Sequence, residues 1–460
     1  MAMERDIIEG GPTMLIPSAF DSDSRRRRDA AFPLGVAALY AALCGGLVLL
    51  SGDSGFGHGT IEWALSDQRQ HLDQINYLRA HPGDLLTYPA SAATTPGFHL
   101  LIATVARVLG IESVAGDSWL RLVPFSLGLA TLALLWHLLR TLCADARLAA
   151  LLCLPILLSK YFLVSSVFFA TENGAYAGYI LLLLAFLRFP ERGLPVGLAG
   201  AAMVLVRQIF LPVVGVHALS YFARRSGRHA AWPRTVATLA AGALPPLAVV
   251  GVFAISWGGL VPPGADPGGH VAATIPNLSP VVETWSLLGL LALPYSLLAL
   301  SAGPLPRGGR PALLLGAALA AALLLWLLAS TVFPPQDDLE GGASPWGSVV
   351  WFVARHSPAL GEHAVLLLPC LLLGFIAAAA AAQLAWARHE FPAELAMFTA
   401  YTLALSVQSF GFQRYTEVPA LLTLSVAAAR LPAASRGACL LFLAAFAAKL
   451  PLSLALQGFG

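Results

Sequence analysis

The run of residues 312–332 reads ALLLGAALAAALLLWLLASTV and contains no charged side chain. A helix needs about 20 apolar residues to cross a hydrocarbon core of about 30 Å. Similar runs recur along the 460 residues, of which 57% are hydrophobic and only 11% are charged. Backbone polar groups find no water in lipid, and these runs are longer than the segments of a membrane barrel, so each span must be a helix. The predicted fold class is therefore all-α, a polytopic helical membrane protein.

Hydropathy predicts about 13 membrane spans in this chain. They cover residues 32–50, 121–139, 148–167, 175–189, 194–206, 208–222, 236–257, 285–302, 312–332, 363–384, 393–408, 418–431 and 438–456. Residues 1–30 lack an apolar core and end in arginines, which predicts a polar cytoplasmic tail before a retained anchor rather than a cleaved signal. We expect residues 31–460 to form a single transmembrane domain, with 51–120 as a large first outer loop.

Arginines are concentrated in alternate connections between the predicted spans. The quartet Arg25 to Arg28 directly precedes the first span, and every second connection after it carries further arginines. By the positive-inside rule the N-terminus is cytoplasmic. The connections that then face the extracytoplasmic side are 51–120, 258–284, 334–362 and 413–417. We expect a multi-pass protein of the plasma (inner) membrane, with the endoplasmic reticulum membrane as the alternative.

The first outer loop has a periodicity of its own. Apolar residues recur at helical spacing over 62–78 and again over 97–109, which predicts amphipathic helices lying on the membrane surface. On the first helix, Asp67, His71 and Gln74 are spaced four and three residues apart and fall on one face. A carboxylate, an imidazole and an amide on one face indicate an active site, but a solvated polar face explains the same spacing.

Neither a metal site nor a nucleotide site is indicated by the sequence. The five cysteines have no paired spacing and lie in or beside spans, so neither a disulfide frame nor a zinc site is expected. The only Asp-x-Asp motif, Asp21-Ser22-Asp23, lies in the polar tail without a strand-helix pattern, which disfavours a cytoplasmic nucleotide-sugar enzyme. We expect no cofactor, no metal and no nucleic-acid partner. The oligomeric state stays open.

A longer pattern of polar residues begins in the first outer loop. Its members there are Asp67, Gln68, His71, Gln74 and Tyr77, followed by Thr94-Thr95-Pro96-Gly97. This pattern resembles the first luminal loop of the dolichyl-phosphate-glucose α-1,2-glucosyltransferases, which add the last glucose to a lipid-linked oligosaccharide. Three further motifs follow in the order of that family, namely Thr171-Glu172-Asn173-Gly174, Arg207-Gln208, and Arg414-Tyr415 with Pro419.

The resemblance covers most of the chain and implies both a fold and an activity. It implies a GT-C class glycosyltransferase, embedded in membrane lipids, that uses a polyprenyl-phosphate-linked sugar as donor and a glycan or lipid-linked glycan as acceptor. The residues that it implies to bind substrate are Gln68, Gln74, Thr95, Gln208 and Tyr415. The chain departs from the family at Gln68, where relatives carry a second acidic residue, and at Glu172, where they carry aspartate. The sugar, the acceptor and the linkage therefore stay open.

The chemistry of such a transfer calls for a base and for cations. A sugar linked to a lipid phosphate already carries a good leaving group, so the enzyme needs a carboxylate that takes the acceptor's proton and cations that hold the phosphate. Asp67 is the candidate base, with Glu172 and Asp73 as alternatives, and His71 would orient the acceptor. The candidate phosphate ligands are Arg207, Arg414 and Lys160. Snorkelling to the interface is the alternative for each cation, and a bond to a loop carbonyl is the alternative for His71.

A secondary transporter, or a flippase for lipids or lipid-linked sugars, is the alternative function. Many spans with charges inside them are typical of such proteins. That interpretation leaves the long, structured first loop unexplained, and paired half-sequences are missing. The sequence therefore favours an inverting enzyme that transfers a hexose over a transporter, and it favours a purely structural scaffold least.

Overall fold

The computed structural model describes most of the chain. The described residues are 19–50, 60–86, 94–115, 119–143, 145–225, 232–262, 277–303, 311–329, 349–407, 413–431 and 434–455, and their side chains are described except at 19–32, 50, 60–67, 225, 311–313 and 450–455. Almost all of these residues are helical, and the strands among them are only two residues long. The predicted all-α class is confirmed.

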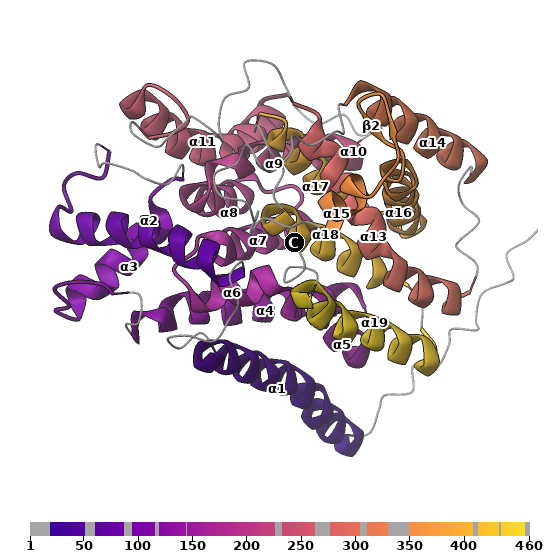
Figure 1. Cartoon of the computed structure of the whole chain (residues 1–460), viewed down its shortest axis with the longest axis horizontal. Helices are drawn as coiled ribbons and strands as arrows, with labels where there is room; N and C mark the ends of the chain where they lie inside the picture. The colour runs from indigo at the N-terminus through magenta and orange to yellow at the C-terminus, as the bar shows by residue number, and fades with distance from the viewer. Residues whose placement is uncertain are drawn as a thin grey trace, which may run out of the picture.

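The helices of the described residues are shown in Figure 1. In chain order they are α1 (Ala19–Leu50), α2 (Thr60–Ala80), α3 (Gly97–Val108), the short 3-10 helix η1 (Trp119–Arg121), α4 (Leu122–Leu142), α5 (Ala146–Leu157), α6 (Lys160–Val167), α7 (Glu172–Arg188), α8 (Gly193–Val206), the 3-10 helix η2 (Gln208–Phe210), α9 (Leu211–Val214), α10 (Val216–Arg225), α11 (Trp232–Trp257), α13 (Ser279–Ser301), α14 (Pro311–Leu328), α15 (Val349–Arg355), α16 (Leu367–Ala387), α17 (Ala393–Leu405), α18 (Gln413–Ala428) and α19 (Arg436–Ala455). An antiparallel hairpin of β1 (Ala359–Leu360) and β2 (His363–Ala364) precedes α16.

Four helices of the described chain are long and apolar enough to cross a membrane. They are Trp119–Leu142 (η1 with α4), Trp232–Trp257 (α11), Ser279–Ser301 (α13) and Leu367–Ala387 (α16). Shorter apolar helices accompany them, namely Pro33–Leu49 within α1, α3, α8, Leu314–Leu328 within α14, and α17. The structure therefore agrees with a helical membrane protein, with fewer full-length spans among the described residues than hydropathy predicts.

One predicted span, residues 148–167, is broken in the structure. α5 and α6 are bent by 74° at Leu158 and Ser159, and together they could form a fifth span. The backbone of Ser159 is extended (φ −74°, ψ 121°), so helical hydrogen bonding stops there and restarts in a new direction. The predicted span 208–222 is likewise divided into η2, α9 and α10, after the extended residue Arg207. Hydropathy averaged over a window does not register one extended residue, so the sequence predicts continuous spans.

Two further boundaries differ from the prediction. α1 begins at Ala19, inside the predicted polar tail, and its helical backbone continues through the arginine quartet. Residues 413–417, predicted as an outer turn, are the first turn of α18 and are mostly buried. At both places polar residues extend a helix that hydropathy alone would end.

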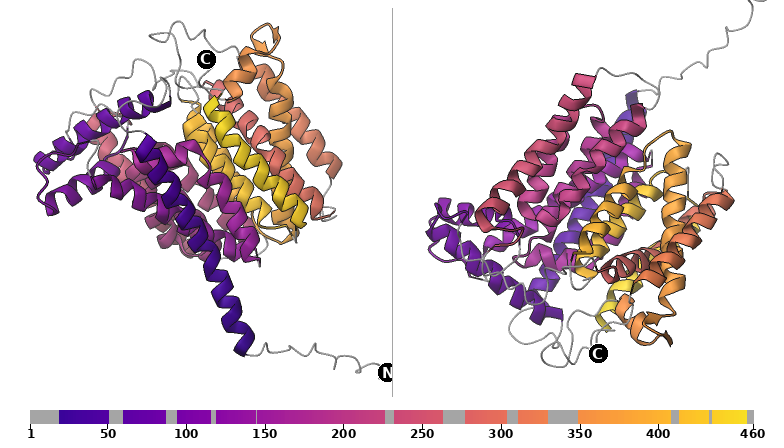
Figure 2. Two further views of the ribbon diagram at one scale, coloured as in Figure 1. Left: turned by 60° about the horizontal axis from the view of Figure 1, so that its bottom comes forward. Right: turned by 90° about the horizontal axis from the view of Figure 1, so that it is seen from above.

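The helices form one bundle, with the first loop at one end of it. Figure 1 shows α2 and α3 together at that end, with α14 and α16 at the other. α2 packs against α3, and α3 packs against α8, which joins the first loop to the bundle. The C-terminal part of α1 lies along the outside of the bundle, against α4, α5 and α6, whereas its N-terminal part projects beyond the other helices (Figure 2).

One close helix crossing depends on glycine. A Cβ atom on Gly289 of α13 would lie 2.0 Å from the carbonyl oxygen of Cys370 in α16, and one on Gly374 of α16 would lie 2.1 Å from that of Trp285 in α13. The two backbones are therefore in direct contact, as is typical where small residues line a crossing of membrane helices. α13 also packs against α18, so this crossing supports the helix that begins with Gln413.

Candidate functional site

Two arginines that are distant in sequence meet at one tyrosine ring. The guanidinium carbon of Arg207 lies 4.3 Å from the centroid of the Tyr415 ring, and that of Arg414 lies 4.5 Å from it. Arg414 Nη2 also donates a hydrogen bond to the hydroxyl of Tyr415. Arg207 directly follows α8, whereas the other two residues lie in the first turn of α18. Attraction between each cation and the ring adds to the packing, so two short motifs of the sequence form one cluster.

Glu172 is the carboxylate of this cluster. It is the first residue of α7, and its Oε1 accepts a hydrogen bond from Arg207 Nη1 at 3.1 Å. The two side chains are 5% and 13% exposed, so the ion pair is largely removed from water. Ser165 Oγ donates to the other carboxylate oxygen at 3.5 Å, and the start of a helix favours a negative group. The Tyr415 cluster, defined as Glu172, Arg207, Arg414 and Tyr415, thus holds two cations and one carboxylate.

Two buried tyrosines fix the backbone of the cluster. Tyr176 of α7 donates its hydroxyl hydrogen to the carbonyl oxygen of Arg414 at 2.8 Å, and Tyr401 of α17 donates to that of Tyr415 at 3.0 Å. Neither residue is among the candidates predicted from the sequence. Tyr176 lies one helical turn after Glu172 and hence on the same face of α7, which is the signal that could have found it. Tyr401 comes from another helix and gives no such signal.

Gln68 attaches the first loop to the segment before α7. Its Oε1 accepts a hydrogen bond from the backbone N–H of Phe169 at 3.4 Å, and the side chain is buried. An amide satisfies this backbone donor without placing a further charge in the interior. Gln68 therefore makes a structural contact beside the binding role that the resemblance implies.

Gln208 ties the first loop to the residue next to Arg207. Its Oε1 accepts from the backbone N–H of Thr95 at 2.9 Å, and its Nε2 donates to the carbonyl oxygen of Leu260 at 3.0 Å. Thr95 is buried, and its hydroxyl donates to the carbonyl oxygen of Val204 at 2.7 Å. The structure thus brings the Thr94-Thr95-Pro96-Gly97 motif to the Arg207-Gln208 motif.

Gly97 is required by the close approach of these two segments. A Cβ atom on it would lie 2.6 Å from the carbonyl oxygen of Leu205 and 2.8 Å from the Cγ of the same residue. Any larger side chain would push the start of α3 away from the end of α8. The glycine of the motif is therefore explained by packing.

His71 pairs with a second histidine. Its Nδ1 lies 2.7 Å from Nε2 of His99 in α3, and both side chains are buried. In this hydrogen bond one ring nitrogen must donate and the other must accept. His99 is not predicted from the sequence, because the two histidines lie on different helices, 28 residues apart. Gln74 is buried as well, so a solvated polar face is the wrong interpretation for these positions of α2.

The side chain of Asp67 lies outside the described residues. Its backbone belongs to α2, directly before Gln68. Helical spacing puts position 67 on the same face as His71 and Gln74, whose side chains are buried. Asp73, on another face of α2, is exposed.

Lys160 belongs to a second charged cluster. It begins α6 after the bend, with its Nζ 4.7 Å from the centroid of the Tyr161 ring. The charged groups that act on it are Glu417 of α18 and Lys449 of α19, which form an ion pair at 2.6 Å. Within the described part of the chain, no hydrogen bond or ion pair joins Lys160 to the Tyr415 cluster. Lys160 therefore pairs with different groups from those of the other two candidate phosphate ligands, although Glu417 lies one helical turn after Arg414 on α18.

No family model, curated protein or solved structure matches this chain. The geometry of the site is therefore the guide to its chemistry. Among the described residues, no three side chains of histidine, cysteine, aspartate or glutamate gather as they would around a metal ion. The Tyr415 cluster offers two planar guanidinium groups with one positive charge in excess, which suits a phosphate-bearing ligand.

Proposed function

We propose that this chain is an integral membrane glycosyltransferase of the GT-C class, with about 13 spans. It takes a sugar, expected to be a hexose, from a polyprenyl-phosphate donor and transfers it to an acceptor hydroxyl at the extracytoplasmic face. The proposal is supported above all by the meeting of Arg207 and Arg414 at one ring. The hydrogen bond between Gln208 and Thr95, which ties the first loop to the residue next to Arg207, also supports it.

In this proposal the donor phosphate lies at the Tyr415 cluster. Planar guanidinium groups bind phosphate oxygens in pairs, and they offset the charge that grows on the leaving polyprenyl phosphate. The acceptor oxygen attacks the anomeric carbon from the side opposite the phosphate. The bond between sugar and phosphate breaks with its electron pair on the phosphate oxygen, so the configuration inverts. Asp67 takes the proton of the acceptor hydroxyl.

Glu172 is better suited to positioning than to proton transfer. Its two oxygens are engaged by Arg207 and Ser165, and its side chain is buried. Its contact with Nη1 holds the Arg207 guanidinium, which lies beside the Tyr415 ring. The base is therefore assigned to Asp67, on the first loop, rather than to this carboxylate.

Replacing either arginine of the cluster by lysine should weaken donor binding although the charge is kept. An ammonium group cannot reproduce the planar fork of a guanidinium. Loss of one charge-assisted contact costs on the order of 1.5–3 kcal/mol, which is about tenfold to hundredfold in affinity. Calorimetry with a short-chain polyprenyl-phosphate hexose measures this loss in Arg207→Lys and Arg414→Lys. Arg107→Lys, at an exposed position of α3, is the matched control. Normal donor binding in both cluster variants would contradict the assignment of the donor phosphate to Arg207 and Arg414.

The proposed orientation can be tested by cysteine labelling in intact cells. Ser113 is exposed between α3 and η1, and Glu191 is exposed between α7 and α8. A membrane-impermeant thiol reagent should label Ser113→Cys but not Glu191→Cys until the cells are opened. The unmodified chain is the background control, since four of its five cysteines are buried and Cys439 is partly buried. Labelling of Glu191→Cys alone in intact cells would reverse the orientation.

A transporter or flippase is favoured by a different observation. The bend between α5 and α6 places Lys160 at a broken helix, near the ion pair of Glu417 and Lys449. Discontinuous helices and charges inside the membrane are typical of secondary transporters. That function gives no role to the docked first loop or to the Tyr415 cluster, so the glycosyltransferase is the preferred proposal.

Chemical turnover separates the two functions. The purified chain in vesicles is given a panel of polyprenyl-phosphate hexoses and pentoses together with a glycolipid extract, and the products are identified by mass spectrometry. The glycosyltransferase proposal expects release of polyprenyl phosphate and the growth of an acceptor by one sugar. If an intact lipid-linked sugar moves across the bilayer with no change in mass, the glycosyltransferase proposal is wrong and the flippase function is supported.

A further inference from the structure

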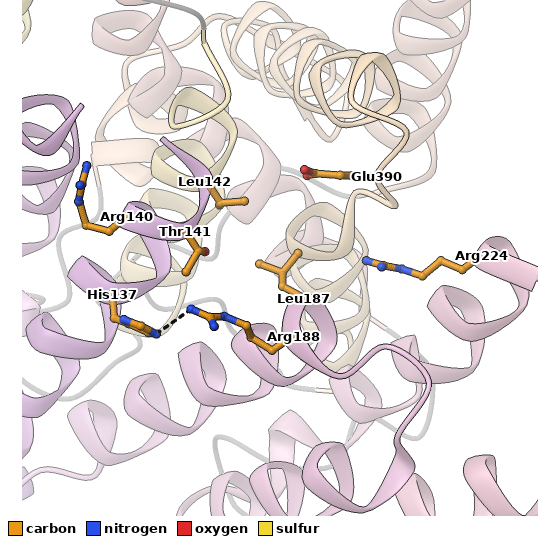
Figure 3. A pocket seen from close by; sticks show the side chains of 8 residues that line it. All are labelled: His137, Arg140, Thr141, Leu142, Leu187, Arg188, Arg224 and Glu390. Carbon is orange, nitrogen blue, oxygen red and sulfur yellow. Dashed lines mark hydrogen bonds between the residues drawn. The ribbon is translucent and has the colours of Figure 1, made fainter. Parts of the chain in front are cut away.

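A basic cavity lies where α4 and α7 end (Figure 3). Its volume is about 560 Å³, and three arginines line it, Arg140 of α4, Arg188 of α7 and Arg224 of α10. Arg188 ends the helix that Glu172 begins. A helix rises 1.5 Å per residue, so the 16 steps from 172 to 188 span about 24 Å, most of the thickness of a hydrocarbon core.

The acidic residue in the lining does not neutralise these arginines. Glu390 is the carboxylate among the described lining residues, and its Oε2 accepts a hydrogen bond from Arg430 Nε at 2.9 Å. Arg430 also forms an ion pair with Glu394. Arg430 lies outside the lining and is shared by these two carboxylates, so its one positive charge cannot balance both of them. The lining therefore sets three arginines against one carboxylate, which leaves an excess of positive charge.

The three arginines are available to a ligand to different degrees. Arg188 Nη2 donates to Nε2 of His137 at 3.3 Å, a neutral partner, which Figure 3 shows as a dashed line. Arg140 Nη1 donates to the carbonyl oxygen of Cys143 at 3.4 Å. Arg224 is exposed and, within the part of the chain that the structure describes, has neither a hydrogen bond nor an ion pair. In Figure 3 its guanidinium points toward the space beside Leu187.

We infer that this cavity binds a phosphate-bearing headgroup. Arginines from three helices line a volume that lies within the range of about 300–1,000 Å³ usual for small-molecule sites. Basic pockets between membrane helices are a known way of holding anionic headgroups. Leu142 and Leu187 add an apolar wall, which suits a phosphate joined to an apolar stem. The phosphate can come from a lipid of the adjoining leaflet or from a soluble ester, and the inference does not depend on the proposed transferase activity.

Two binding experiments on the purified full chain distinguish these sources. In neutral detergent, native mass spectrometry measures the retention of phosphatidylglycerol against phosphatidylcholine. Calorimetry with glycerol 3-phosphate measures the binding of a soluble ester. The double variant Arg188→Gln with Arg224→Gln should lower the affinity for whichever probe binds by about tenfold or more, because it removes two charge-assisted contacts. Arg436→Gln, at an exposed arginine of α19 outside the cavity, should bind like the unmodified chain.

The single variant Arg224→Gln serves if the double variant folds poorly, because this exposed side chain has no hydrogen bond or ion pair to lose within the described residues. Retention of phosphatidylglycerol that these variants reduce supports a lipid headgroup. A heat of glycerol phosphate binding that they reduce supports a soluble ester. The inference is overturned if the unmodified chain binds neither probe, or if the cavity variants bind as well as Arg436→Gln.

Discussion

Asp67→Asn is expected to lower the turnover of lipid-linked sugar by roughly 10²- to 10⁴-fold, the usual contribution of a general base. The substitution keeps the size of the side chain and removes its proton acceptor. Donor affinity should be unchanged, because the phosphate is assigned to Arg207 and Arg414 rather than to the first loop. The two quantities are measured separately, as release of polyprenyl phosphate at saturating substrate and as donor binding without acceptor.

Asp73→Asn is the matched control for this experiment. Asp73 lies on the same helix, carries the same group and is exposed, whereas helical spacing puts Asp67 on the face of buried His71. The control should turn over substrate at a nearly normal rate. If Asp67→Asn were the nearly normal variant, the base would be sought at Asp73 or Glu172 instead.

Glu172→Gln is expected to destabilise the folded protein by about 3–5 kcal/mol, the cost of leaving one member of a buried ion pair without its partner. The carboxylate and the Arg207 guanidinium are 3.1 Å apart and largely shielded from water. An amide can still accept a hydrogen bond from the arginine, but it cannot balance the charge. Chemical denaturation in detergent micelles measures the change in the free energy of unfolding.

A second variant separates charge imbalance from loss of packing. Glu172→Gln combined with Arg207→Gln leaves neither charge unpaired, so much of the lost stability should return. Glu112→Gln, at an exposed carboxylate after α3, should leave the free energy of unfolding nearly unchanged. A double variant less stable than Glu172→Gln alone would mean that the contacts of Arg207 with its other neighbours, and not its ion pair, hold the cluster together.

The helical class follows from composition, whereas the number of full-length spans does not. Apolar periodicity predicts the helices over 62–78 and 97–109, and α2 and α3 confirm them within two residues at each end. A single extended residue, such as Ser159 or Arg207, ends a helix without changing the mean hydropathy around it. Hydropathy averaged over a window therefore does not detect the broken span 148–167 or the divided span 208–222.

The candidate site could be predicted only in part, for a related reason. Short motifs indicate Glu172, Arg207 and Tyr415, but nothing in their spacing shows that a carboxylate and a ring would engage the same guanidinium. His99 and Tyr401 could not be found, because each contributes through a partner on another helix. Contacts between helices depend on crossings such as that of α13 and α16, which the sequence does not specify position by position.

One side-chain amide, that of Gln208, connects the first loop to the end of α11. Its oxygen holds Thr95 of the first loop, and its nitrogen holds Leu260, just beyond the end of α11. The first loop and the end of α11 are thus held together by hydrogen bonds to one residue. In the proposed transferase, an outward movement of the loop that admits a lipid-linked donor would have to break the first of these bonds. Because Arg207 is the adjacent residue in the chain, such an opening of the proposed transferase would take place directly beside a proposed phosphate ligand.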